Sequence, residues 1–202
     1  MKKILIALMA LLVIPMALAT DFKQGTHYEV IKQTATAKPE VMEFFSYYCP
    51  HCYKFEPVAK SIQSSLPAGV AFKKNHVSFL GGKVMGEEMV RAYAVAEMLN
   101  VDSQVSSAIF DAIHVKRQRF SSRDDIRDIF VANGVDAKKF DSAANSFVVN
   151  GMVSQMDKNT INYKIRGVPA LVINGKYQVN TGSVKSLEEL NQLVTYLVNL
   201  KV

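Results

Sequence analysis

The two cysteines of this chain stand three positions apart, in the tetrapeptide Cys49-Pro50-His51-Cys52, and they are the only cysteines among the 202 residues. The apolar run Val41-Met42-Glu43-Phe44-Phe45 comes shortly before them and is typical of a buried strand. Pro50 suits the first turn of a helix, where its missing N–H group leaves no hydrogen bond unmade. We therefore predict a strand, a short loop and then a helix whose first turn carries both thiols.

This spacing favours a reactive dithiol over a structural crosslink. Residues i and i+3 of a helical turn lie about 5 Å apart, within the Cα separation of roughly 4.4 to 6.8 Å that a disulfide accepts. Both redox states therefore fit one backbone. A bond that closes so short a loop restricts the unfolded chain little and adds little stability. The pair is better explained by its chemistry.

The N-terminus has the three parts of a secretory signal. Lys2 and Lys3 precede the apolar stretch 4–14, and Ala17-Leu18-Ala19 is a small-x-small cleavage pattern. We predict a signal peptide over residues 1–19 and Thr20 as the first mature residue. The apolar stretch is shorter than the roughly 20 residues of a membrane span. We therefore expect an exported, soluble protein.

The charge of the chain argues against nucleic acid as a partner. The formal net charge is +6, and loss of Lys2 and Lys3 with the signal lowers it to +4. The surplus is spread along the sequence, and its densest patch is Lys-Arg-Gln-Arg at 116–119, which we interpret as a solvated face. Nothing in this pattern indicates a polyanion-binding surface.

The hydrophobic pattern changes period twice along the chain. Alternating apolar residues at 70–79 predict a second strand, and after Gly81-Gly82 the period becomes helical as far as the 160s. Asn174-Gly175 between two short apolar runs predicts a hairpin, and an amphipathic helix follows at 187–197. The order predicts an α/β fold with an inserted helical subdomain. Its parts are 20–80, the helical insertion 81–160, and 161–202.

Five segments of the sequence are similar to the DsbA family of periplasmic thiol:disulfide interchange proteins from Gram-negative bacteria. The Cys-Pro-His-Cys tetrapeptide together with Gly167-Val168-Pro169 is the most specific part of the likeness. The resemblance covers nearly the whole mature chain, and it implies a thioredoxin fold interrupted by the helical insertion. It also implies that the mature protein lies in the periplasm. The segments are 43–56, 76–82, 125–130, 145–149 and 166–177.

The position of each cysteine predicts its role. Cys49, at the exposed end of the helix, faces the unpaired N–H groups and positive dipole end that favour a thiolate, so we expect it to be the nucleophile. Cys52 lies one turn further on the apolar face, where burial disfavours ionisation, which fits the resolving thiol. His51 can donate to the Cys49 sulfur and stabilise the reduced pair, and a more stable reduced form is a stronger oxidant.

The resemblance assigns further residues to the site. It implies a cis bond between Val168 and Pro169, facing the dithiol, and the Val168 backbone could then pair with an extended substrate. A trans proline opening an edge strand is the alternative. It also implies that Glu43 and a nearby lysine, matching Lys74, tune the dithiol or relay a proton, although Lys73 leaves that choice open. Strand alternation could equally point Glu43 at water, and Glu56 would adjust the local field.

The function that follows is that of a thiol:disulfide oxidase. The resemblance implies that the Cys49–Cys52 disulfide passes to newly exported unfolded proteins and that a quinone-linked inner-membrane protein of the DsbB type restores it. We expect a monomer without a cofactor. Two cysteines cannot close a zinc site, and Tyr53 stands where haem attachment requires histidine. A binding domain with a fixed disulfide and a reductase or isomerase are the alternatives; an N-terminal dimerisation domain has no room before Cys49.

Overall fold

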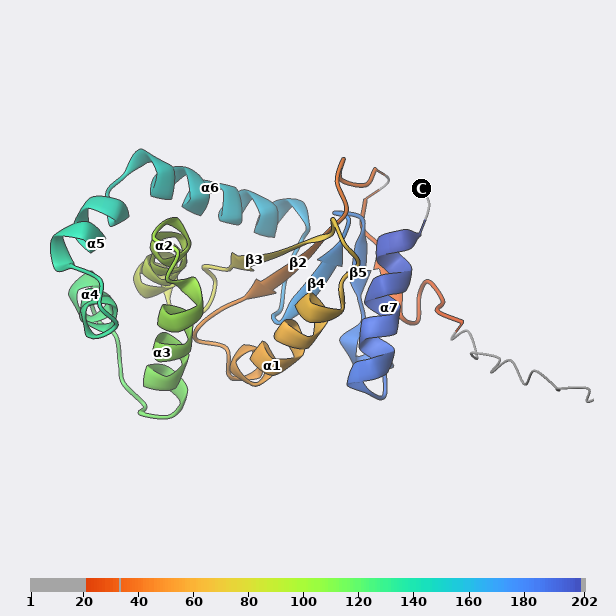
Figure 1. The fold of residues 1–202 in the computed structure, drawn as a ribbon, viewed down its shortest axis with the longest axis horizontal. Coiled ribbons are helices and arrows are strands. Elements are labelled where there is room, and N and C mark those ends of the chain that lie inside the picture. The colour runs from red at the N-terminus through yellow and green to blue at the C-terminus, as the bar shows by residue number, and fades with distance from the viewer. Residues whose placement is uncertain (1–20, 33, 201–202) are drawn as a thin grey trace, which may run out of the picture.

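The computed structural model describes residues 21–32 and 34–200, so the predicted signal peptide at 1–19 lies outside the described part. Within these residues no helix is both long and apolar enough to cross a lipid bilayer. Strands lie toward both ends of the chain, and the middle is helical (Figure 1). The elements in chain order are β1 (Tyr28–Val30), β2 (Glu40–Phe45), α1 (Pro50–Ser65), β3 (Ala71–His76), α2 (Lys83–Met98), α3 (Asp102–His114), α4 (Arg123–Ala132), α5 (Ala137–Ala144), α6 (Phe147–Asn162), β4 (Ala170–Ile173), β5 (Tyr177–Val179), the short 3-10 helix η1 (Thr181–Ser183) and α7 (Leu187–Asn199).

Five strands form one mixed sheet in the order β1-β5-β4-β2-β3. β2 runs parallel to β3 on one side and antiparallel to β4 on the other, so it is a central strand. The predicted hairpin is confirmed: it joins β4 to β5, and Asn174 and Gly175 at its turn have φ values of 52° and 62°. Such a pair of positive φ values is what a two-residue hairpin turn requires.

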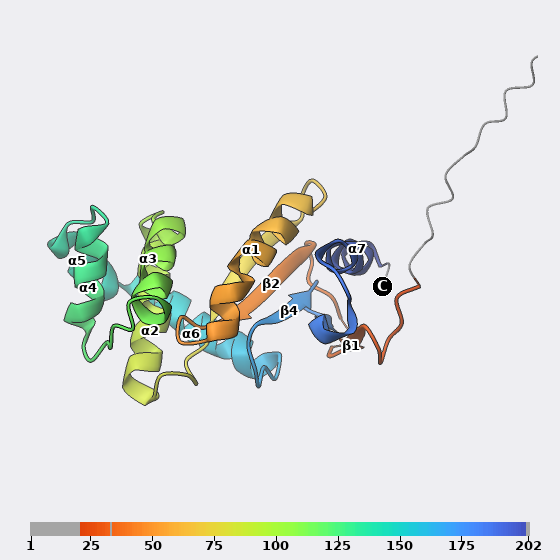
Figure 2. The ribbon, with the colours of Figure 1, turned by 90° about the horizontal axis from the view of Figure 1, so that it is seen from below.

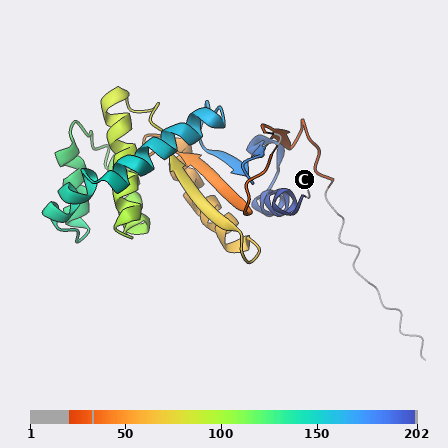
Figure 3. The ribbon, with the colours of Figure 1, turned by 90° about the horizontal axis from the view of Figure 1, so that it is seen from above.

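Helices cover both faces of this sheet (Figures 1, 2 and 3). α1 and α7 lie side by side on one face, and the end of α6 lies over the other. Alternate side chains of β2 therefore enter different cores, with Val41 among residues of α1 and α7 and Phe44 in a smaller cluster with Val172. Because both faces are covered, β2 reads in the sequence as a continuous apolar run.

The helices α2 to α6 form a body of their own between β3 and β4, beginning at Lys83 and ending at Asn162. Its core reaches the end of β2, because Phe45, Tyr47 and both cysteines belong to the same buried cluster as α2 and α3. The dithiol therefore lies where the sheet and the helical body share one core. The domain boundaries at 80/81 and 160/161 stay a prediction.

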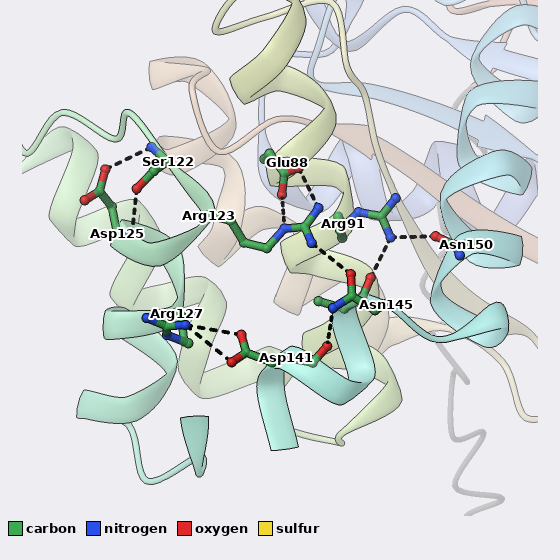
Figure 4. A network of polar contacts seen from close by, with 10 residues as sticks. Glu88, Arg91, Ser122, Arg123, Asp125, Arg127, Asp141, Asn145 and Asn150 are labelled. Atoms are coloured by element: carbon green, nitrogen blue, oxygen red, sulfur yellow. Dashed lines mark hydrogen bonds and ion pairs between the residues drawn. The ribbon is translucent and has the colours of Figure 1, made fainter. Parts of the chain in front are cut away.

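Charged side chains fasten the helices of this body to one another (Figure 4). Arg123 of α4 donates to both carboxylate oxygens of Glu88 in α2 at 2.8 Å and to the Asn145 side chain at 3.1 Å. Arg91 of α2 donates to the Asn150 side chain in α6 at 2.7 Å. Bidentate arginine pairs of this kind fix orientation as well as distance. The network gives α3, which contacts the dithiol segment, a stable support.

Candidate active site

Cys49 caps the helix that carries the dithiol. Its backbone is extended, and its Sγ accepts a hydrogen bond from the Cys52 N–H at 3.2 Å, so the sulfur takes the place that a serine or aspartate oxygen has in an ordinary N-cap. Pro50 fills the first helical position, as predicted. The Cys49 sulfur therefore points at the unpaired N–H end of α1, where negative charge is favoured.

Cys49 is less exposed than its place at the helix end suggests. Only 5% of the residue is accessible, because the segment before β4 lies against it. The Val168–Pro169 bond is cis, and the Cys49 thiol donates to the Val168 carbonyl oxygen at 3.3 Å. The trans alternative is thus wrong. The Val168 backbone and the nucleophilic sulfur face each other, although they are 119 positions apart in the chain.

Cys52 lies wholly inside the protein, with no accessible surface. Burial, followed by the nearby Cys49 sulfur, raises the pKa of the Cys52 thiol well above its usual range, and the charge of Glu43 adds to this effect. The two thiols therefore differ in environment as predicted: one caps the helix and the other is enclosed. Both are unbridged in this structure.

Glu43 lies beneath the dithiol and is fully buried. It projects from the central strand β2, so neither face offers water, and strand alternation could not reveal this. Burial raises the pKa of Glu43 to about 7, while Lys74 pulls it down and Glu56 pushes it up. Lys74 Nζ is 3.3 Å from Oε2, but within the described residues neither Glu43 oxygen has a hydrogen bond of good geometry. The contact is therefore an ion pair without a directed bond.

The strand register decides which lysine accompanies Glu43. Lys74 of β3 pairs with Glu43 in the parallel ladder, whereas Lys73 pairs with Met42 and projects from the opposite face. Lys73 there binds Glu40 at 2.7 Å, and 53% of its side chain is exposed against 19% for Lys74. The choice that the sequence left open thus falls on Lys74.

Glu56 completes a charged triad on the α1 face of the sheet. Its carboxylate accepts a hydrogen bond from the Lys74 ammonium group, so Lys74 lies between two acids. Burial opposes the positive charge of Lys74, but the two carboxylates outweigh it and raise the pKa of this lysine. Lys74 therefore stays charged at neutral pH, while Glu43 is able to gain or lose its proton there.

Two histidines that sequence analysis left aside hold the loop before Cys49. His76 Nε2 accepts from the Tyr47 N–H at 2.9 Å, and His114 Nε2 lies 2.8 Å from the Tyr47 carbonyl oxygen. The Tyr47 hydroxyl is bonded to Ser106 Oγ at 2.7 Å. Burial lowers the pKa of His76 to about 3, so this histidine is a neutral acceptor. No local pattern predicts these contacts, which join residues 29 and 67 positions apart.

The rim of the site is made by a tight contact between Tyr48 and Gly81. Gly81 has a φ of 85°, and a Cβ placed on it would lie 2.2 Å from the Tyr48 ring. His51, between the two cysteines, is exposed, as is Pro50. Within residues 21–32 and 34–200 no three His, Cys, Asp or Glu side chains gather as a metal site would require. The chemistry available at this place is therefore that of two thiols beside a buried acid.

A strand–helix junction with a capping thiol, a buried partner thiol and a facing cis-proline defines a thiol:disulfide oxidoreductase of the thioredoxin class. The chain matches the family described as "DSBA-like thioredoxin domain" over residues 40–194. It therefore belongs to the DsbA family, and the predicted family and fold class are confirmed.

Relatives with the same name match most of the chain. The thiol:disulfide interchange protein DsbA of Escherichia coli (strain K12) is 40% identical over 183 residues, which are 89% of this chain and 87% of that one. DsbA of Dickeya dadantii is 41% identical over 97% of this chain and 95% of its own length. The crystal structure of the disulfide oxidoreductase DsbA from Proteus mirabilis has a TM-score of 0.79 and 41% identity, covering 89% and 96% of the two chains.

Proposed function

We propose that this protein is a periplasmic oxidase that passes its Cys49–Cys52 disulfide to newly exported polypeptides through a mixed disulfide. The observation that carries the proposal is the difference between the two thiols: Cys49 Sγ accepts the Cys52 N–H at 3.2 Å at a helix N-terminus, and Cys52 is enclosed. A thiolate at position 49 is stabilised by the capped helix, and this stabilisation favours the reduced protein. A protein more stable when reduced is an oxidant.

The first step is attack by a substrate thiolate on the Cys49 sulfur. The new bond joins substrate and Cys49, the bond between Cys49 and Cys52 breaks, and its electron pair stays on the Cys52 sulfur. A second substrate thiolate then attacks the substrate sulfur of the mixed disulfide. Cys49 leaves as a thiolate, two electrons have passed to the protein, and the substrate holds a disulfide.

Proton delivery to Cys52 is the part of this reaction that needs help. Its raised pKa makes the Cys52 thiolate a poor leaving group unless a proton arrives. Glu43, with a pKa of about 7, holds a proton in a large fraction of molecules at neutral pH and lies close enough to influence Cys52. We assign Glu43 the role of proton donor in oxidation of substrate and proton acceptor in the return, with Lys74 and Glu56 setting its pKa.

The backbone beside the dithiol supports a place for the substrate. The Val168 carbonyl lies 3.3 Å from the Cys49 sulfur, and the following cis-proline turns it toward the thiol. An extended segment that carries the attacking cysteine would pair with Val168 by strand addition. A crystal structure of a DsbA variant from Proteus mirabilis with the non-covalently bound peptide PWATCDS is among the solved relatives, and that protein therefore accepts a cysteine peptide.

Continued turnover requires that the dithiol be oxidised again. We assign this step to a quinone-linked inner-membrane protein of the DsbB type, which would engage the same sulfur, Cys49. The predicted signal peptide supports delivery to the periplasm, where such a partner and the unfolded substrates would both be met. His51 supports the oxidising character, since it is exposed beside Cys49 and able to donate to its sulfur.

The test is the equilibrium of the mature protein with glutathione. We expect a potential above roughly −180 mV, whereas a reductase such as thioredoxin lies near −270 mV. The variant His51→Ser should lower the potential, and Lys54→Ser, one helical turn beyond, serves as a matched change. A potential near that of thioredoxin would overturn the oxidase proposal. A protein that forms no mixed disulfide with a reduced unfolded substrate would instead be a binding domain.

A further inference from the structure

The surface around the dithiol has one sign of charge. Three segments surround the Cys49 sulfur: the loop and first helical turn at 46–54, the loop after α3 at 115–122, and the cis-proline segment at 163–170. Together they contain six Lys and Arg residues and no Asp or Glu. The six are Lys54, Lys116, Arg117, Arg119, Lys164 and Arg166, and all of them are exposed.

Printed contacts tie each segment to the reacting sulfur. The cis-proline segment reaches it through the Val168 carbonyl at 3.3 Å. The loop after α3 begins at His114, whose ring lies 2.8 Å from the Tyr47 carbonyl oxygen and stacks on Tyr53 with a centroid distance of 5.2 Å. Figures 1 and 2 both show the lower end of α3 on the same side of the molecule as the first turn of α1.

The loop after α3 presents its cations from a fixed backbone. The Lys116 N–H donates to the Asp111 carbonyl at 2.9 Å, and the Gln118 N–H donates to the Ala112 carbonyl at 2.8 Å. Arg117 between them has a φ of 56°, in the left-handed region. These bonds hold the turn, so Lys116, Arg117 and Arg119 remain beside the site whatever the state of their side chains.

The nearby acids are already engaged. Glu43 is buried, Glu56 is bonded to Lys74, and Asp111 accepts from the Tyr53 hydroxyl at 3.1 Å. None of the six cations has an ion-pair partner among the described residues, since the ion pairs there involve other lysines and arginines. A cleft lined by one sign of charge raises the local concentration of ligands of the other sign.

We propose that these three segments select substrate segments that carry aspartate or glutamate next to the cysteine to be oxidised. This inference rests on the proposed oxidase function and names its substrate class. The cations act before the chemical step: they draw the acidic segment onto the Val168 backbone and raise the rate of encounter with Cys49. The patch at 116–119 is then part of the substrate surface and not merely a solvated face.

The test compares three peptides that differ at one position. PWATCDS, the peptide of the Proteus mirabilis complex, is set beside PWATCSS and PWATCKS. The measurement is the second-order rate at which excess peptide reduces the oxidised protein, with acid quenching and mass spectrometry. Two peptide thiols then yield one peptide disulfide and the protein dithiol. We expect PWATCDS to react about tenfold faster than PWATCKS at an ionic strength of about 0.01 M, where charges act over about 30 Å.

Salt and a matched pair of variants separate charge from other effects. At about 1 M salt, where the screening length is about 3 Å, the three rates should converge. The variant K54Q/R119Q/R166Q should lose most of the preference at low salt. The variant K138Q/K139Q/K158Q removes three exposed lysines of the helical body and should keep it. Because the chain has no tryptophan, the fluorescence of the single peptide tryptophan gives a second readout, the affinity.

Each outcome has a definite meaning. Equal rates for the three peptides at low salt would overturn the selection of acidic substrates while leaving the oxidase proposal intact. No reduction by any peptide would instead overturn the oxidase proposal. Salt-sensitive binding to phosphatidylglycerol vesicles without any peptide preference would assign the cations to a membrane surface, and this result too would overturn the inference.

Discussion

His114 Nε2 lies 2.8 Å from the carbonyl oxygen of Tyr47, so the last residue of α3 is bonded to the loop that leads into Cys49. The same ring stacks on Tyr53, the residue after Cys52, at an interplanar angle of 14°. One side chain of the helical body thus contacts the chain on both sides of the dithiol. The insertion therefore supports the redox centre directly, in addition to covering it.

Replacing His114 tests this support. His114→Ala should lower the free energy of unfolding by about 1 kcal/mol, the usual worth of one hydrogen bond, and slow thiol oxidation by up to about fivefold as the loop loosens. His114→Gln keeps a donor and should recover most of the rate. The measurements are urea unfolding and the rate of oxidation of a reduced peptide. A glutamine variant as slow as the alanine variant would show that the bond to Tyr47 does not matter.

His27→Ala is the control for that experiment. His27 accepts a hydrogen bond from the Lys23 N–H at 2.9 Å near the start of the described chain, and it contacts the Phe22 ring. The same kind of residue and bond is lost there, away from the dithiol. We expect a similar change in stability with no change in the oxidation rate.

Glu43 should make stability fall as the pH rises from about 4.5 to 7. Its pKa is raised from 4.5 to about 7 in the folded protein, so between these values the native state holds a proton that the unfolded chain has lost. Stability then decreases with pH, by about 3 kcal/mol over this window. Urea unfolding at several pH values should show a flatter profile for Glu43→Gln than for the unchanged protein. Parallel profiles would contradict a carboxyl of raised pKa.

The same variant separates a catalytic role from a structural one. If Glu43 gives a proton to Cys52, the rate at which substrate thiolates open the disulfide should show a transition near pH 7 that disappears in Glu43→Gln. Lys73→Gln, on the opposite face of the sheet, should leave this transition in place. A profile unchanged by loss of the acid would leave Glu43 without a part in the reaction.

Lys74 and Lys73 offer a matched pair of neighbouring lysines. Lys74→Met leaves the buried Glu43 and the half-buried Glu56 without their cation, and we expect a loss of about 3 kcal/mol at pH 8. Lys73→Met breaks one pair on an exposed lysine and should cost less than about 1 kcal/mol. The loss at Lys74 should shrink at pH 6, because Glu43 takes up a proton there. Equal losses for the two variants would show that burial does not distinguish them.

The sequence predicted those features that depend on local pattern. The capping thiol at Cys49, Pro50 in the first turn and the hairpin at Asn174-Gly175 all follow from spacings of a few residues, and each is found. The capping box of Ser122 and Asp125 is complete. The one at Ser186 is half formed, because the Glu189 side chain accepts from the Lys185 N–H instead.

What the sequence could not predict depends on tertiary contacts. The burial of Glu43 needs helices on both faces of β2, and the choice of Lys74 needs the register of β2 against β3. The low exposure of Cys49 arises from a segment more than a hundred residues away. The strand β1 has three residues and no pattern long enough to be recognised. Each of these features becomes visible only when distant segments are placed side by side.

Gly81 should be the least replaceable glycine near the site. Gly81→Ala puts a Cβ 2.2 Å from the Tyr48 ring and forces alanine into a φ of 85°, so we expect a loss of at least about 2 kcal/mol and a displaced Tyr48 beside Cys49. Gly151→Ala, in the interior of α6 with open space around it, should instead add about 1 kcal/mol of stability. Thermal unfolding of both variants measures the contrast.

A double-mutant cycle divides the cost at Gly81 into its two causes. Tyr48→Ala removes the ring that the new Cβ would meet but leaves the left-handed backbone unchanged. If the clash dominates, Gly81→Ala should cost clearly less in the Tyr48→Ala background, because the two residues are in contact and their effects do not add. If backbone strain dominates, the cost should be the same in both backgrounds. In the first case the glycine is needed because the tyrosine ring before Cys49 rests on it, and Gly81→Ala should also alter the oxidation rate, whereas Gly151→Ala should not.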